Sequence, residues 1–353
     1  MIGWRSLVLD ATLIVMIAAS VIYLRRVAMP RPPVGRFTGG DIAIMSVMLI
    51  VLPAAYLQLP ALAVSAVFGL VLFTAAQTAL APLAGGRVAL GIAALAVAAE
   101  ITAKLTGHAH VMLIVNDALI VVAVVGVVNL WAQTGMSAAH VTALAVVLTA
   151  YDIAATWLGA LTSDFLNKVA TEPFLPLLAV VGGTHPGGFG LGDCLVLAMW
   201  PVVLVKAYGK RPAWIGAIIG LTVAVIIEFA FKDHWVGFYA VIPTMSIVGP
   251  LIIVQYVVLR RRLGRERRTG EWRAGRAADA PGDVGPLVEQ ALAACTGAGG
   301  EAPGEYLAVA GGEIVAAASA PGAARRAARL LGGGPVPVVV HRSLTMPPAA
   351  GRP

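Results

Sequence analysis

Charged residues are scarce in this chain of 353 residues. Asp, Glu, Lys and Arg together make up 12% of the sequence, which is about half of the roughly 25% found in an ordinary soluble domain. Hydrophobic residues account for 59%, and the mean hydropathy is +0.87. This composition excludes a soluble enzyme and a disordered protein, and it predicts an integral protein of the lipid bilayer.

Cysteine is nearly absent, and histidine is sparse and scattered. Cys194 and Cys295 are too few for a disulfide framework, and we expect both to be free thiols. No histidine has a neighbouring ligand at the spacing of a metal site; the six are His108, His110, His140, His185, His234 and His341. We therefore expect neither a metal nor an organic cofactor.

The apolar runs are long enough for about nine transmembrane helices. A bilayer core of about 30 Å requires about 20 apolar residues per helix. By this measure the expected spans are 6–24, 41–57, 61–82, 88–105, 111–131, 141–160, 189–208, 213–231 and 239–259. A further apolar run, 174–183, is too short to cross and suits a half-buried or re-entrant segment.

Basic residues in the short loops predict the orientation. Eleven Lys and Arg residues lie in loops on one side of the membrane, the side of the loop after the first span. Four lie on the opposite side. Because basic loops stay in the cytoplasm, we expect the N-terminus outside and the C-terminal tail in the cytoplasm. This pattern also explains the net charge of +7 without nucleic acid as a partner.

The composition changes after Arg262, and the expected fold is an all-α membrane protein with a small α+β soluble unit at its C-terminal end. We divide the chain into a membrane domain (1–262), a linker (263–304), a small unit (305–342) and a disordered tail (343–353). In the small unit, strands are expected at Tyr306–Ala310, 313–319 and 336–341, and a helix at 322–331. No catalytic residues are visible there, which favours an adaptor or regulatory role.

Ionisable residues inside apolar spans are costly and are therefore candidates for function. They are Asp10, Glu100, Asp117, Asp152, Asp193 and Glu228. Glu100 is expected to pair with Lys104 one helical turn away. Asp117 could hydrogen-bond a neighbouring helix, and Glu228 has Lys232 as a local partner.

Asp152 and Asp193 differ from the other acids. Asp152 lies inside its span with no basic residue within a turn, and Asp193 follows a segment with four glycines in six residues (187–192). The expected depths are about 12 Å and about 6 Å from the outer surface, at about 1.5 Å per residue. The two carboxyls could therefore face each other, with glycines admitting water and an extended peptide. A plain glycine-rich loop leading into a helix is the alternative.

Two motifs resemble those of a known family. Tyr151–Asp152 looks like the YD motif, and Gly190–Leu191–Gly192–Asp193 looks like the GLGD motif, of the presenilin/signal peptide peptidase family of intramembrane aspartyl proteases. They fall on the sixth and seventh of the expected spans, as in that family, and the resemblance covers residues 1–262. The family's Pro-Ala-Leu motif is represented at the ninth span by Pro243–Thr244–Met245, so only its proline is kept.

The resemblance implies a protease of bacterial or archaeal type in the plasma membrane. Asp152 and Asp193 would then be catalytic, and the outside N-terminus resembles the signal peptide peptidase branch. Substrates would be transmembrane helices or remnant signal peptides. The other motif residues would bind the substrate; they are Tyr151, Gly190, Leu191, Gly192, Pro243, Thr244 and Met245.

The chemistry of two close carboxyls suits this role, because such a pair tends to share one proton and can activate water. Which aspartate acts as the base is left open, since the pair titrates as a unit. Pro243 lacks an N–H and could leave a backbone carbonyl free for the substrate.

Three other functions fit parts of the sequence. A prepilin peptidase also uses two aspartates and a GxGD motif, but the residues after Asp193 lack the basic residue expected there. A proton- or ion-coupled transporter would explain buried acids and glycine-interrupted helices, although no inverted repeat is evident. A non-catalytic scaffold for the C-terminal unit is the third.

Overall fold

The computed structural model describes most of the membrane part and three strands of the tail. The described residues are 4–29, 37–157, 159, 161–179, 188–232, 244–267, 269, 271–272, 306–310, 313–318 and 338–341. Contacts divide the chain into two units, Met1–Thr269 and Gly270–Pro353. We describe each unit by itself.

The first unit is built from long apolar helices. Its helices are α1 (Trp4–Arg26), α2 (Gly39–Gln58), α3 (Ala61–Ala84), α4 (Gly86–Leu105), α5 (Ala109–Thr134), α6 (Ala138–Asp152), α7 (Leu161–Val169), α8 (Leu191–Ala207), α9 (Lys210–Lys232) and α10 (Thr244–Leu263). Among the described residues, seven of these are long and apolar enough to cross a membrane: α1 to α5, α6 with the turn after it, and α10. This confirms a mostly helical protein with several spans. α8 and α9 lie where the seventh and eighth spans are expected, and α8, with 17 residues, is shorter than these seven.

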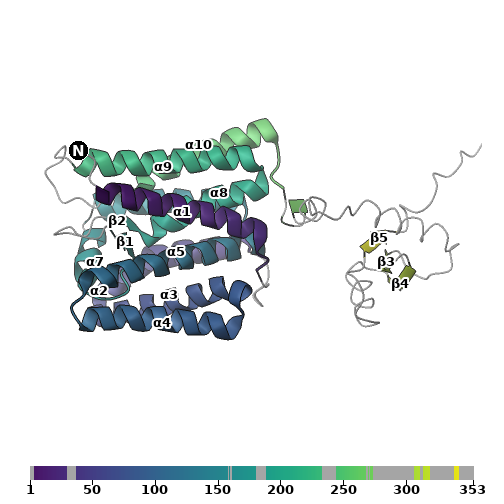
Figure 1. The fold of residues 1–353 in the computed structure, drawn as a ribbon. Helices are drawn as coiled ribbons and strands as arrows, with labels where there is room; N and C mark the ends of the chain where they lie inside the picture. The colour runs from purple at the N-terminus through teal and green to yellow at the C-terminus, as the bar shows by residue number, and fades with distance from the viewer. Residues whose placement is uncertain are drawn as a thin grey trace, which may run out of the picture. The chain divides into compact units, whose positions relative to one another are not determined.

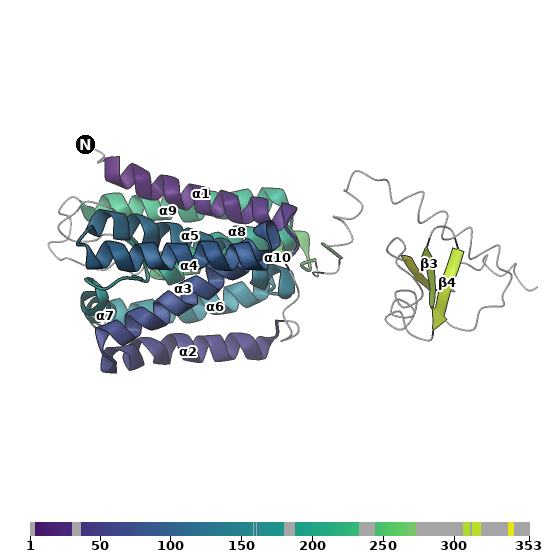
Figure 2. The same ribbon diagram turned by 60° about the horizontal axis from the view of Figure 1, so that its bottom comes forward.

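The long helices lie side by side, roughly along one direction (Figures 1 and 2). α5 is central, since it packs against α1, α3, α4 and α8, and Ile120, Val124 and Val128 on it are fully buried. The outer helices expose large apolar side chains instead, among them Leu70 and Leu95. Such a surface suits contact with lipid rather than water.

Short elements gather at one end of the bundle, between α6 and α8. Helix α7 (Leu161–Val169) lies in the connection between the expected spans 141–160 and 189–208, where no helix is expected from the sequence. In the described part of the short apolar run 174–183, Leu177–Ala179 forms strand β1, which pairs antiparallel with β2 (Gly188–Gly190). Figure 1 shows α7, β1 and β2 at the same end as the N-terminus.

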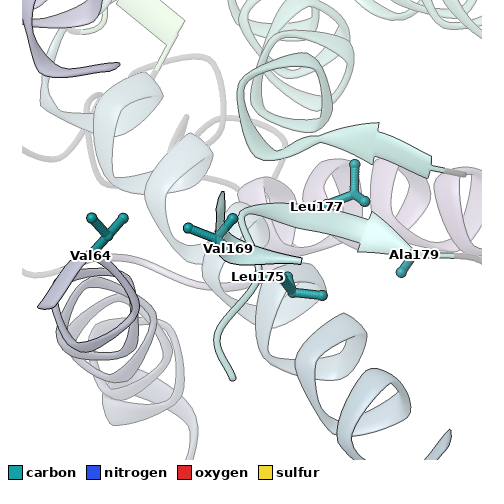
Figure 3. Packing of buried hydrophobic residues seen from close by; sticks show 5 residues of the cluster. All are labelled: Val64, Val169, Leu175, Leu177 and Ala179. Atoms are coloured by element: carbon teal, nitrogen blue, oxygen red, sulfur yellow. The ribbon is translucent and has the colours of Figure 1, made fainter. Parts of the chain in front are cut away.

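A small hydrophobic cluster anchors these short elements to the helices. Its buried members come from α3, α7 and the strand segment, namely Val64, Val169, Leu175, Leu177 and Ala179 (Figure 3). Aromatic rings extend the cluster, since Phe68 of α3 lies with its ring centroid 5.6 Å from that of Tyr56 and 6.1 Å from that of Phe165. The strand therefore rests on a packed apolar base at the end of the bundle.

The second unit contains a three-stranded sheet in the order β4-β3-β5. β3 (Tyr306–Ala310) pairs antiparallel with β4 (Glu313–Ala318), which confirms the predicted hairpin. β5 (Val338–His341) pairs with the other edge of β3. The helix predicted at 322–331 lies outside the described residues.

The contact boundary after Thr269 lies beyond the boundary expected at 262. The reason is that residues just after α10 bond to the membrane helices. Glu266 accepts a hydrogen bond from the backbone N–H of Ala138 at the start of α6 (2.6 Å). The backbone N–H of Arg267 donates to the carbonyl of Ala207 at the end of α8 (3.1 Å).

Candidate functional site

Asp152 lies where helix α6 changes its winding. α6 ends at Asp152, and a π-helical turn follows over Ile153–Trp157. The sequence placed this aspartate inside one regular span, 141–160. Because π-helical turns are rare and concentrate at functional sites, the change of winding beside a membrane carboxyl is itself a functional indication.

The Asp152 carboxyl caps the N-terminus of α10. Its Oδ2 accepts a hydrogen bond from the backbone N–H of Met245 (2.8 Å), and the N–H of Ser246 also donates to the carboxyl. The first N–H groups of a helix have no partner within it and carry partial positive charge. The start of α10 therefore holds Asp152 in a fixed position.

Asp193 lies in the first turn of α8, two residues after that helix begins at Leu191. The hydroxyl of Thr244 and the backbone N–H of Gly190 hydrogen-bond its carboxyl, and the charge of Asp152 acts on it. Thr244 is the first residue of α10 and is only 3% exposed. The two aspartates, 41 positions apart in the sequence, thus both contact residues 244–246.

Side-chain bonds fasten α6 to α10 beside this site. The Thr149 hydroxyl donates to the carbonyl of Ala145 in its own helix (2.7 Å) and to the carbonyl of Met245 (3.1 Å). Gly249 lets the two helices approach, since a Cβ there would lie 1.8 Å from the Thr149 Oγ1. Sequence reasoning missed Thr149, although its position three residues before Asp152 puts it on the same helix face.

The remaining motif residues surround the aspartates in different ways. Tyr151 is half-buried, and the Leu191 N–H donates to the carbonyl of Pro176 (2.9 Å). Gly192 is exposed, with no atom within 4 Å of where its Cβ would be. Met245 is buried. Pro243, predicted to contact the substrate, lies outside the described residues.

The other buried acids have partners that the sequence did not suggest. The predicted pair between Glu100 and Lys104 is wrong. Glu100 accepts a hydrogen bond from the N–H of Phe174 (2.6 Å), and the Lys104 ammonium donates to the carbonyl of Thr171. Asp117 accepts from the N–H of Ala179 on β1 (2.8 Å) rather than bonding a helix. These bonds form only because 171–179 folds back onto α4 and α5. The Glu228 side chain lies outside the described part of the chain.

The described part of the chain contains no candidate metal site. No group of three or more His, Cys, Asp or Glu residues there is close enough to hold an ion. Among the described residues, the chemistry-bearing groups that meet at the site are two carboxyls, a hydroxyl and backbone N–H groups. Such a set can bind and activate water.

We expect the Thr244 hydroxyl to be important at this site, although the Pro-Ala-Leu motif has an alanine at this position. If the site has the protease activity that the motif resemblance implies, we expect Thr244→Val, which keeps the shape but removes the hydrogen bond to Asp193, to lower kcat about tenfold. Thr244→Ser, which keeps a hydroxyl, should stay within about threefold of the wild type. Cleavage rates of a synthetic transmembrane helix measure both variants, and equal rates for the valine and serine variants would contradict the contact's role.

No family model, curated protein or solved structure matches this chain. The likeness to the presenilin/signal peptide peptidase family therefore rests on the two motifs.

Proposed function

We propose that the protein is an intramembrane aspartyl protease that hydrolyses peptide bonds in transmembrane helices or remnant signal peptides. One observation carries the proposal: Asp152 and Asp193, from separate helices, both contact residues 244–246 at the start of α10. Two acids so close in a low-dielectric environment favour sharing one proton. That is the protonation state required for aspartyl protease chemistry.

The reaction needs only these two carboxyls and one water. The ionised carboxyl takes a proton from water while the water oxygen bonds to the scissile carbonyl carbon, and the protonated carboxyl gives its proton to the carbonyl oxygen. The resulting diol collapses as the C–N bond breaks. The nitrogen takes a proton from one carboxyl, and a diol hydroxyl returns a proton to the other. The pair again holds one proton.

A helical substrate must unwind locally before water can reach its backbone. The chain around Asp193 offers room for an extended strand, because Gly192 faces open space and β2 pairs with no described strand besides β1. The unpaired edge of a strand can accept another extended chain by backbone hydrogen bonds. Gly188–Gly190 would thus hold a peptide next to Asp193.

The loop charges support an orientation with the N-terminus outside and the C-terminal tail in the cytoplasm. Figure 1 places α7, β1 and β2 at the end of the bundle where the chain begins. Arg260, Arg261 and Arg262 end α10. Since basic helix ends stay in the cytoplasm, the aspartates lie toward the outer face of the membrane. Substrate helices would have their N-termini inside.

Cysteine labelling in intact cells tests this orientation. We expect a membrane-impermeant thiol reagent to label Asp164→Cys, on an exposed position of α7, and not Ser319→Cys in the tail. Cys194 is fully buried and can stay, whereas Cys295 is replaced by serine. Labelling at 319 alone would reverse the topology and the expected direction of the substrate.

Reconstitution into liposomes tests the function itself. The purified protein should cut a synthetic transmembrane helix into two fragments, which mass spectrometry detects. Liposomes with a pH-sensitive dye inside, but without substrate, measure proton uptake in parallel. Uptake that depends on Asp193, with the helix left intact, would favour a transporter and overturn the protease.

A further inference from the structure

We propose that Glu100 and Asp117 are positioning residues that hold strand β1, and through it β2, in a fixed register beside Asp193. This role rests on the proposed function, because it concerns where the protease cuts. Neither acid contacts Asp152 or Asp193 by a hydrogen bond in the described part of the chain. Both instead bind the backbone of the segment that runs into the site.

Each acid accepts one backbone N–H of this segment. Glu100 of α4, which is fully buried, accepts from Phe174 (2.6 Å), and Asp117 of α5 accepts from Ala179 (2.8 Å). A buried carboxyl is costly unless its bonds compensate. Glu100 and the partly buried Asp117 lie on neighbouring helices and both bond to one short segment, which indicates a constraint on that segment rather than on the helices.

Asn116 completes the attachment from the same helix turn as Asp117. Its Nδ2 donates to the carbonyl of Leu177 (3.1 Å). Backbone groups of successive residues in a strand point to opposite edges, so residues two apart share an edge. Leu177 and Ala179 thus use one edge of β1 to bond to α5, and Leu178, which pairs with Phe189, lies between them. In effect, Asn116 and Asp117 take the place of a third strand.

Phe174 fixes the start of the segment. It is a non-glycine residue with positive φ (57°), a conformation that costs energy and persists only where neighbours impose it. Its ring covers Gly69 of α3, where a Cβ would lie 2.7 Å from the ring. The Glu100 bond to its N–H and the ring contact together impose the turn that leads into β1.

The constraint reaches the active carboxyl in two steps. β1 pairs with β2 residue by residue, with Leu177 opposite Gly190. Gly190 in turn donates its N–H to Asp193, and the next residue, Leu191, donates to Pro176. A slip of β1 would therefore shift β2 against Asp193 and change which substrate bond lies at the two aspartates.

The packing in Figure 3 agrees with this role. Leu175, Leu177 and Ala179 belong to one buried cluster with Val169 and Val64, so apolar contacts hold the strand in place laterally. Apolar contacts are non-directional and do not define the register alone. The hydrogen bonds to Glu100, Asn116 and Asp117 are directional and fix the register of β1.

Variants that keep or remove the acceptor oxygen test the proposal. Glu100→Gln and Asp117→Asn keep an acceptor and should cut one synthetic helix at the wild-type bond. Glu100→Ala and Asp117→Ala remove it and should give additional cleavage positions, with kcat lowered about tenfold. Titration with a tight-binding hydroxyethylene inhibitor gives the concentration of folded active sites. Each cleavage rate is divided by that concentration, so that a loss of folded protein is not mistaken for a loss of activity.

Product masses decide the outcome. Alanine variants that cut only at the wild-type bond with unchanged kcat would overturn the positioning role and leave the protease intact. Amide variants with products as mixed as those of the alanine variants would overturn it too. If the alanine variants bind no inhibitor, Asn116→Ala is measured with the same two criteria. A wild-type protein that cuts nothing would instead overturn the proposed function and this role with it.

Discussion

Cleavage should disappear when either aspartate becomes an amide. We expect Asp152→Asn and Asp193→Asn each to lower the cleavage rate about a thousandfold or more, because an amide cannot take or give the proton that the reaction moves. The fold should survive. The amide oxygen of the Asp152→Asn variant can still accept from the N–H of Met245, and that of the Asp193→Asn variant can still accept from the Thr244 hydroxyl. The measurement is the rate of product formation at equal amounts of purified protein.

Asp164→Asn is the matched control for both variants. Asp164 is an exposed acid on α7, twelve positions after Asp152. The same change of acid to amide there should leave the rate within about twofold, as expected for a surface substitution. Normal cleavage by either dyad variant would refute the shared role of the two carboxyls.

The cleavage rate should be equally sensitive to a larger side chain at Gly249, where α6 and α10 approach each other closely. A side chain at position 249 would meet the Thr149 Oγ1 at 1.8 Å and the Ala145 carbonyl at 3.1 Å. Gly249→Val therefore forces the helices apart and moves the start of α10 away from Asp152. Misplacement of a catalytic group by about 1 Å can cost about a hundredfold in rate. We expect a loss of about that size, with a lowered Tm in detergent.

Gly91→Val in α4 is the matched control, because an added Cβ there meets nothing within 4 Å. It should leave cleavage and Tm nearly unchanged. A double variant tests whether steric overlap causes the loss of rate. Adding Thr149→Ala to Gly249→Ala removes the side-chain atom that the new Cβ would meet first, and it should recover part of the rate lost by Gly249→Ala alone. Wild-type activity in Gly249→Val would contradict the geometry at the start of α10.

Hydropathy and motif spacing predicted most of the helical frame. Apolar run length alone located the helices to within a few residues, because a helix in lipid must satisfy its backbone internally over a fixed thickness. The two aspartates were selected by the cost of ionisable groups in such runs. The pairing of β3 with β4 in the small unit was predicted from the alternation in Tyr306–Ala310 and from the Gly-Gly pair that follows, which is a turn signal in the sequence.

The features missed depend on contacts distant in sequence. Nothing near Glu100 indicates that it accepts from Phe174, 74 positions later, so the nearer Lys104 was expected instead. Strands β1 and β2 are three residues each, too short for alternation to reveal. The link between Thr244 and Asp193 requires the starts of α10 and α8 to be neighbours. The order of the spans predicts that both helices begin on the same side, but no local pattern shows that their starts are in contact.

The most direct test of the dyad is an experimental structure of the protein with a peptide isostere that carries a hydroxyl in place of the scissile carbonyl. The account predicts that Asp152 and Asp193 both hydrogen-bond that hydroxyl, with their Cβ atoms within about 10 Å. It also predicts that residues 244–246 remain bonded to both carboxyls. An isostere bound elsewhere, or either aspartate turned to the lipid, would contradict the proposal that this protein is an aspartyl protease.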